Sequence, residues 1–192
     1  LLEDEVRLVR VEAAWALRRE LDVGSRAGKD LVASMDQSAD QPGGALQWGR
    51  FHLDRGRARK AIPWMERAVR WDPVTAEHRG ALAVAFQENG QGERALRALD
   101  EAATLAPENP QWPFARALVH AESGQLEDAI TDLEQACALD PAFGRAWYNL
   151  GLAQAQIGRG QEAIESLTRA EAAEPLEPEY PYARATIHRD QG

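Results

Sequence analysis

Residues 144–175, GRAWYNLGLAQAQIGRGQEAIESLTRAEAAEP, contain the pattern that decides the fold. After Trp147-x2-Leu150-Gly151 come a glycine, a small residue, a large apolar residue, a second small residue and a proline. The same types return every 34 residues in four rows without insertion. The columns are Gly56, Gly90, Gly124 and Gly158; Ala61, Ala95, Ala129 and Ala163; Met65, Leu99, Leu133 and Leu167; Ala68, Ala102, Ala136 and Ala170; and Pro73, Pro107, Pro141 and Pro175. Such self-similarity predicts a tandem array of helical hairpins.

Each row is predicted to contain helix A of about 13 residues, a glycine turn, helix B of about 14 residues and a proline exit. The rows run over 42–75, 76–109, 110–143 and 144–177, followed by a half row at 178–192. Glycine suits the turn because it adopts positive φ without a steric penalty. The alanine columns should let helices A and B approach closely. Pro113 and Pro181 fall in first helical turns, where proline is tolerated, whereas Pro63 predicts a kink or a late start of its helix.

The period and the columns resemble the tetratricopeptide repeat over residues 42–192. This resemblance implies an all-α fold, a right-handed α-solenoid of antiparallel helix hairpins. It also implies a concave groove, lined by one face of the A helices, that binds a peptide. The groove residues would be Leu46, Arg50, Leu53, Val84, Gln87, Phe114, Leu118, Ala121, Tyr148, Asn149, Leu152, Tyr182, Thr186 and Arg189.

The groove residues are mostly apolar or aromatic, which favours a partner segment with apolar anchors. The family also has a carboxylate-clamp mode that needs Lys and Asn on helix A, and only Asn149 and Arg145 come close to it. The alternative is that neighbouring segments of the array, or the rest of a parent protein, cover this face.

The first 41 residues precede the array. Residues 1–21 predict a helix with an apolar stripe of Leu8, Val11, Trp15 and Ala16, and they resemble the second half of a HEAT repeat. A plain capping helix is the equal alternative. A polar helix is predicted around residues 30–36. The Gln41-Pro42-Gly43-Gly44 break then predicts a boundary between segments 1–41 and 42–192.

Charge is unevenly distributed in a chain with 22 Lys+Arg and 31 Asp+Glu, a net charge of −9. This sign argues against binding to a nucleic-acid backbone. Residues 42–75 nevertheless contain seven Lys or Arg and three Asp or Glu, whereas residues 110–143 contain one Arg and six acidic residues. Solvated outer helix faces explain this pattern, and a polarised docking surface is the alternative. No apolar run approaches the length of about 18 residues that a membrane span needs.

Chemistry-bearing residues are few. The single cysteine, Cys137, is predicted to be a small buried or half-buried apolar residue rather than a reactive thiol. His52, His120 and His188 occupy one column, but whole hairpins separate them, so a half-buried packing role is predicted and no metal site. The sequence contains no phosphate loop, His-Glu-x-x-His, Cys-x-x-Cys or Gly-x-Ser-x-Gly motif. We therefore expect no enzymatic activity and no cofactor.

Two functions fit these observations. The first is a scaffold that binds a protein or peptide partner in the A-helix groove. The second follows from the whole arrangement, which resembles the C-terminal region of bacterial multi-haem cytochrome proteins with such repeats. That resemblance implies a non-catalytic docking arm of a periplasmic electron-transfer protein; otherwise a cytoplasmic location is expected. The chain opens and stops in mid-pattern, which predicts a piece of a longer protein, and the half row could mediate self-association.

Overall fold

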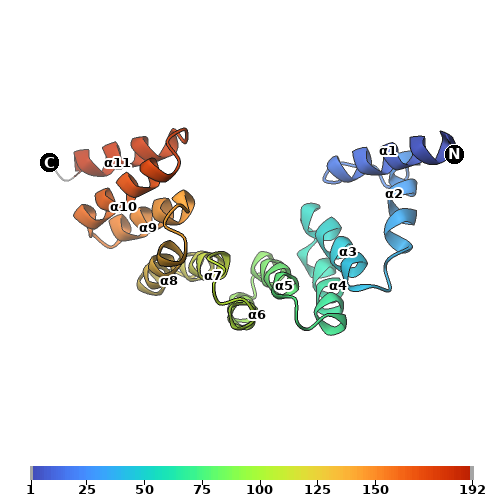
Figure 1. Ribbon diagram of the computed structural model, residues 1–192, viewed down its shortest axis with the longest axis horizontal. Helices are drawn as coiled ribbons and strands as arrows, with labels where there is room; N and C mark the ends of the chain where they lie inside the picture. Colours follow the sequence, from blue (N-terminus) through green and yellow to red (C-terminus); the bar gives the residue numbers. More distant parts are fainter. Residues whose placement is uncertain (1, 191–192) are drawn as a thin grey trace. The chain divides into compact units, whose positions relative to one another are not determined.

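A computed structural model describes residues 2–190, which form eleven α-helices and no β-strand (Figure 1). The helices are α1 (Leu2–Ala16), α2 (Arg26–Asp36), α3 (Pro42–Asp54), α4 (Ala58–Trp71), α5 (Ala76–Glu88), α6 (Gly92–Leu105), α7 (Gln111–Glu122), α8 (Leu126–Leu139), α9 (Gly144–Gln156), α10 (Gly160–Ala173) and α11 (Glu179–Asp190). The chain divides into two compact units, Leu1–Arg94 and Ala95–Gly192. The predicted all-α repeat architecture is confirmed.

The glycine turns have the predicted conformation. Gly56, Gly90, Gly124 and Gly158 are the four residues with positive φ among those described, with values of 64°, 72°, 75° and 81°. At the turn after α5, the Gly90 amide donates to the Gln87 carbonyl at 2.9 Å, and the Gln91 amide donates to the Phe86 carbonyl at 2.8 Å. These two bonds define a Schellman cap, and the other three turns repeat them. Each A helix followed by such a turn therefore ends in the same way.

The B helices end where the sequence places an X-Pro pair. Asp72, Asp140 and Glu174 each precede a proline and have φ between −138° and −133°, outside the helical region. The proline ring disfavours helical backbone at the preceding residue, so the helix stops there.

The small-residue columns form the contact between helices A and B. Every alanine of both columns is fully buried, and the large apolar residues between them are at most 2 % exposed. Gly151 of α9 adds to this close approach, because a Cβ atom there would lie 2.7 Å from Leu167 Cγ on α10. The predicted helix A–helix B interface is therefore confirmed.

The first unit contains the N-terminal helices and the first hairpin, α3–α4. Leu31 and Met35 of α2 are fully buried with Ala14 of α1 and Phe51 of α3, so three helices share one core. The sequence predicted a polar helix around residues 30–36, whereas α2 begins at Arg26 and has a buried apolar face. Ser25 caps it by accepting a hydrogen bond from the Gly28 amide at 3.1 Å.

The prediction for the first helix is wrong. The first helix ends at Ala16 rather than at residue 21, and Leu8 is 64 % exposed because the packed face of α1 runs through Ala14. The helix that contains Pro63 begins at Ala58, so the predicted late start is absent. The kink at Pro63 and the HEAT resemblance remain predictions.

The second unit has a continuous core from α7 to α10. Phe114, Ile130, Leu133 and Leu150 form its centre, and Phe143, just before α9, and Trp147 of α9 pack against it. Helix α10 adds Leu167, and α11 packs on α9 and α10. This unit therefore presents two outer faces, one on the A helices and one on the B helices.

Candidate protein-binding surfaces

The predicted A-helix groove falls in both units. In the first unit, Leu46, Arg50 and Leu53 lie on α3, and Val84 and Gln87 lie on α5. These helices contact each other. Val84 is 42 % exposed, Arg50 is exposed, and the others are half-buried. The structure therefore brings these five residues onto two neighbouring A helices.

In the second unit, the best-defined part of the predicted groove lies on α9 and α11. The Tyr148 ring packs 4.9 Å, between centroids, from the Tyr180 ring, and burial raises the pKa of Tyr148. Leu152 is half-buried and Tyr182 is 76 % exposed. Tyr180 itself was not predicted; its hydroxyl donates to a Glu174 carboxylate oxygen at 2.8 Å.

The remaining predicted residues of this unit differ in accessibility. Phe114 is 5 % exposed and packs 4.8 Å from the Phe143 ring, so it belongs to the core rather than to an open surface. Leu118 packs beside it, and Ala121 is exposed. The Asn149 amide donates to the Arg145 carbonyl of its own helix at 2.8 Å. On α11, Thr186 is half-buried and Arg189 is exposed.

The histidine column is spread over three helices. His52 on α3 and His120 on α7 are half-buried, whereas His188 on α11 is exposed. Burial lowers the pKa of His52, and nearby cations, Lys60 first, act in the same direction. The packing role predicted for the column therefore describes His52 and His120, and not His188.

A partly buried ion pair joins α7 to α8. Arg116 donates to both oxygens of Asp132, whose side chain is 7 % exposed, and it also contacts Asp100 of α6 at 2.9 Å. Asp132 raises the pKa of Arg116. Removing one partner would leave the other charge desolvated and unpaired, which is strongly destabilising. The pair therefore fixes the packing of these helices. The sequence signal was an arginine where the other full rows have Trp48, Leu82 and Leu150.

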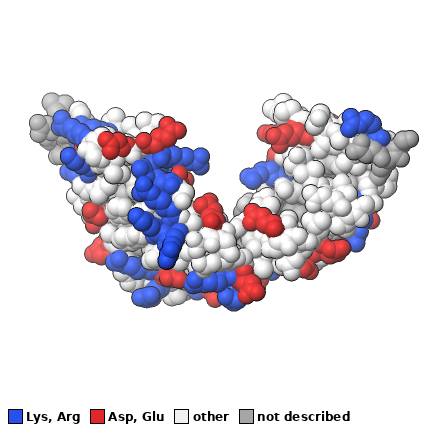
Figure 2. Space-filling model, turned by 180° about the vertical axis from the view of Figure 1, so that it is seen from behind, with Lys and Arg blue, Asp and Glu red and all other residues white. Residues whose placement is uncertain are grey.

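Aromatic and basic side chains gather on α3 and α4. The Trp48 and Trp64 rings stack at 5.5 Å, and the Arg67 guanidinium lies 5.0 Å from Trp64 and 4.5 Å from Trp71. Figure 2 shows Lys and Arg side chains over this part of the chain. The exposed cations on these helices and their turn are Arg50, Arg57, Arg59, Lys60 and Arg70. The excess of basic residues seen in row 42–75 of the sequence is therefore a local feature of the α3–α4 hairpin.

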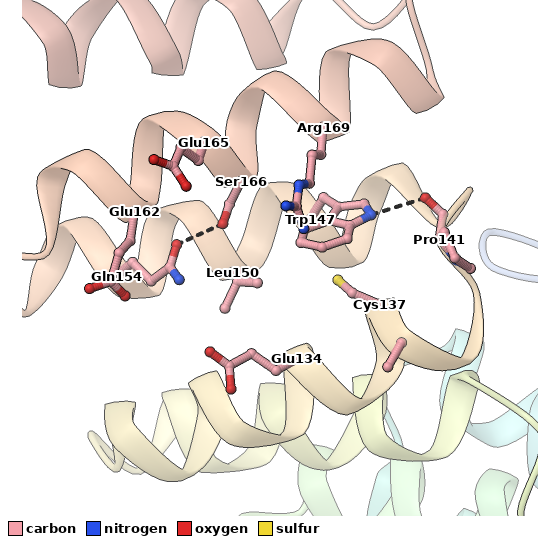
Figure 3. Close-up of a pocket in the computed structure, with 11 residues that line it drawn as sticks. Glu134, Cys137, Pro141, Trp147, Leu150, Gln154, Glu162, Glu165, Ser166 and Arg169 are labelled. Atoms are coloured by element: carbon pink, nitrogen blue, oxygen red, sulfur yellow. Dashed lines mark hydrogen bonds between the residues drawn. The ribbon is translucent and has the colours of Figure 1, made fainter.

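The B-helix side of the second unit contains a cleft that was not predicted from the sequence. It has a volume of about 490 Å³ and lies between α8, α9 and α10 (Figure 3). Its lining residues are Glu134, Cys137, Ala138, Pro141, Trp147, Leu150, Gln154, Glu162, Glu165, Ser166 and Arg169. An adjoining hollow of about 560 Å³ shares Pro141, Trp147 and Arg169, and adds Ala142, Ala172 and Ala173.

Trp147 forms the wall between the two hollows. Its Nε1 donates to the Pro141 carbonyl at 3.0 Å, and the Arg169 guanidinium lies 4.7 Å from its ring centroid. Behind this wall, the Ser166 hydroxyl donates to the Gln154 side chain at 2.8 Å, and both residues are buried. These contacts hold α9 and α10 together and fix the tryptophan in one orientation.

Cys137 lies on the cleft floor and is 2 % exposed. Burial raises the pKa of its thiol to about 12, because the thiolate loses its solvation there. This finding agrees with the predicted role as a small buried residue. Among the described helices, none is long and apolar enough to span a bilayer.

Comparisons with known proteins agree with this architecture. Models of the tetratricopeptide repeat match residues 46–110 and 144–175, and a model described as TPR repeat matches residues 117–158. No curated protein sequence matches the chain.

Solved structures share the fold at low sequence identity. A fragment of MamA from Desulfovibrio magneticus RS-1 is 23 % identical, with a TM-score of 0.68 over 79 % of this chain and 86 % of that one. YrrB, described as a TPR protein with an unusual peptide-binding site, is 20 % identical, with a TM-score of 0.65 over 83 % and 82 %. The first TPR of Spaghetti (RPAP3), bound to an HSP90 peptide, is 21 % identical, with a TM-score of 0.58 over 62 % and 95 %. At these identities the similarity concerns the fold.

Proposed function

The chain belongs to the tetratricopeptide repeat family, and we therefore propose that it is a non-catalytic scaffold whose A helices bind a segment of a partner protein. The coarse role, protein–protein interaction, follows from the family and from structural neighbours with peptide sites. The finer proposal concerns which residues contact the partner.

The observation that carries this proposal is the exposure of Tyr182 on α11, beside a helix, α9, that holds the half-buried Tyr148 and Leu152. These residues lie on α9 and α11, which pack together, and Tyr182 leaves three quarters of its surface in water. Large aromatic side chains on a rigid surface are the usual anchors of protein interfaces. The Tyr148–Tyr180 contact holds one of them in place. A partner segment with apolar side chains would cover all three residues at once.

Site-specific photocrosslinking tests this assignment and captures the partner in the same experiment. A photoreactive phenylalanine analogue replaces Tyr182 in one version of the protein and Leu176 in a control. Leu176 is 94 % exposed but lies in the loop before α11. We expect one defined crosslinked protein from position 182 and none from position 176. Equal crosslinking from both positions, or none from position 182, would contradict the proposal.

The crosslinked segment is then made as a peptide and its affinity measured by calorimetry. Leu152→Ala and Tyr182→Ala should each weaken binding by more than about fivefold, since each removes more than about 1 kcal/mol of contact. Val74→Ala is the matched control, because Val74 is 75 % exposed and lies in the other unit. If that control weakens binding as much as Tyr182→Ala does, the surface has been misplaced.

A further inference from the structure

The cleft between α8, α9 and α10 is separate from the proposed A-helix surface. Trp147, Leu150 and Gln154 of α9 line the cleft, whereas Tyr148 and Leu152 of the same helix belong to the A-helix surface. At 100° per residue, the mean directions of these two sets differ by about 150°. A partner on one surface therefore leaves the other accessible.

One end of the cleft is acidic. Figure 3 shows Glu134 on α8 opposite Glu162 and Glu165 on α10. All three are exposed at the cleft mouth. Glu162 is 3.7 Å from Arg159, and both of these side chains are about half exposed, so water screens that contact strongly. Glu165 has a long contact, 3.5 Å, with the Gln161 amide.

Among the described residues that line the cleft, Arg169 is the one cation. Its guanidinium is stacked on the Trp147 ring. The lining therefore holds three negative groups and one positive group, a local excess of two negative charges. Carboxylates from α8 and α10 face each other across this end of the cleft. A positively charged ligand group would replace the solvent between them.

The other end of the cleft is apolar. Beyond the Trp147 wall, the adjoining hollow is lined by Pro141, Ala142, Ala172 and Ala173, and at the wall itself by Arg169, whose guanidinium lies over the tryptophan ring. Small side chains at these positions leave room for one larger apolar side chain. An acidic end and an apolar end, side by side, require a ligand with two neighbouring features.

We propose that this cleft is a second docking site, which binds a protein segment carrying a lysine or arginine next to a large apolar residue. The cation enters among Glu134, Glu162 and Glu165, and the apolar side chain packs beside Trp147. Such a segment satisfies both ends of the cleft. An acidic segment or a nucleic acid would place like charges against the three carboxylates.

Fluorescence anisotropy with labelled synthetic peptides tests this proposal on the intact chain. The probe is a short peptide of repeated Gly-Ser-Arg-Leu, and the comparison peptides are Gly-Ser-Glu-Leu and Gly-Ser-Arg-Ser repeats. We expect binding of the Arg-Leu peptide that weakens with added salt, weaker binding of the Arg-Ser peptide, and none of the Glu-Leu peptide. Equal binding of all three peptides would overturn the proposal.

Charge-matched variants separate the cleft from the general charge of the protein. The variant Glu134→Gln, Glu162→Gln, Glu165→Gln should bind the Arg-Leu peptide about tenfold more weakly, as loss of three partly screened charge contacts predicts. The control, Glu88→Gln, Glu108→Gln, Glu127→Gln, removes the same charge at positions outside the cleft. Its binding should change by less than about twofold. Equal losses in the two variants would overturn the proposal.

The variant Arg169→Gln should change the affinity for the Arg-Leu peptide in the opposite direction. This change removes the one cation of the described cleft lining and uncovers the Trp147 ring, so the Arg-Leu peptide should bind more tightly, by about threefold. Weaker binding would show that Arg169 is itself a ligand-binding group and would overturn the assignment.

Sedimentation velocity tests whether another copy of this chain occupies the cleft instead. If the basic α4 of a second copy fills the cleft, the protein will self-associate, and Arg59→Gln with Arg70→Gln will abolish that self-association. That result would also overturn the proposal of a separate segment.

Discussion

Cys137 shows how burial controls the chemistry of a single side chain. Its raised pKa, about 12, keeps the thiol protonated at neutral pH. At pH 8 the thiolate fraction is on the order of one in ten thousand, against roughly one in four for an unperturbed cysteine. We therefore expect iodoacetamide to modify Cys137 slowly in the native protein and rapidly in urea, as measured by mass spectrometry. Equal rates in the two conditions would contradict the burial of this thiol.

The same pKa shift makes stability depend on pH in the alkaline range. A thiol whose pKa is higher in the folded state than in the unfolded state stabilises the fold fully below the unfolded value, about 8.5. This contribution is lost as the pH rises from there toward 12. Urea midpoints of the wild type should therefore fall more steeply between about pH 8.5 and about pH 10.5 than those of Cys137→Ala. Parallel pH profiles would contradict the shift.

The surroundings of two helical glycines predict that substitution by alanine will have opposite effects on stability. A Cβ at Gly151 would lie 2.7 Å from Leu167 Cγ and 3.0 Å from the Ala163 carbonyl oxygen, whereas nothing lies within 4 Å of one at Gly43. Gly151→Ala should therefore destabilise the protein by ~1–3 kcal/mol. Gly43→Ala should stabilise it by up to about 1 kcal/mol, since alanine favours the helix. Urea denaturation of both variants measures the two signs.

At the scale of the elements, the contact between helices A and B depends on the alanine columns. Ala129 of α8 is fully buried in the second core, so Ala129→Leu should overpack the hairpin and lower the free energy of unfolding by ~1–3 kcal/mol. Ala138→Leu on the exposed side of the same helix is the control and should have little effect. Thermal unfolding measures both. An unchanged midpoint for Ala129→Leu would contradict this packing.

The periodic elements could be predicted from the sequence because each row places the same residue types at its turn and at its helix A–helix B contact. The turn at Gly124 and the burial of Leu133 are examples. The first helix could not be placed in this way. It has no equivalent row for comparison, and the helix on which it packs, α2, lies outside the repeat as well. The Arg116–Asp132 pair was also missed, because its two members lie in different columns and meet only across a hairpin.

At the scale of the whole molecule, each unit has its own core, so damage to one should stay local. Leu31 is fully buried in the first unit and Leu167 in the second. Each Leu→Ala change should cost about 2–5 kcal/mol. Repeat arrays are held together by neighbour contacts, so hydrogen exchange should accelerate in helices of the mutated unit only. Acceleration throughout the chain in both variants would show that the units unfold together.

The candidate surfaces were predictable to different degrees. The A-helix surface follows from helical spacing within one row, so Leu152 and Tyr182 could be named from the sequence. Phe114 has the same spacing, but it is covered by Phe143 from the loop between α8 and α9, which helical spacing does not reveal. The cleft combines three helices from two rows, and its acidic residues share no column. Only the packing of α8 on α9, and of α9 on α10, brings Glu134 opposite Glu162.

The identical Schellman caps have a consequence for how such a gene can change. Since all four turns share one backbone conformation, a deletion or duplication from one turn glycine to the next joins two ends of equal geometry. Recombination in steps of 34 residues would thus preserve every remaining turn. The related segments at Pro110 and Pro178, two rows apart and both beginning Pro-x-aromatic-Pro-aromatic-Ala-Arg-Ala, have the spacing that such an exchange leaves behind. The array can therefore gain or lose docking surfaces as whole cassettes.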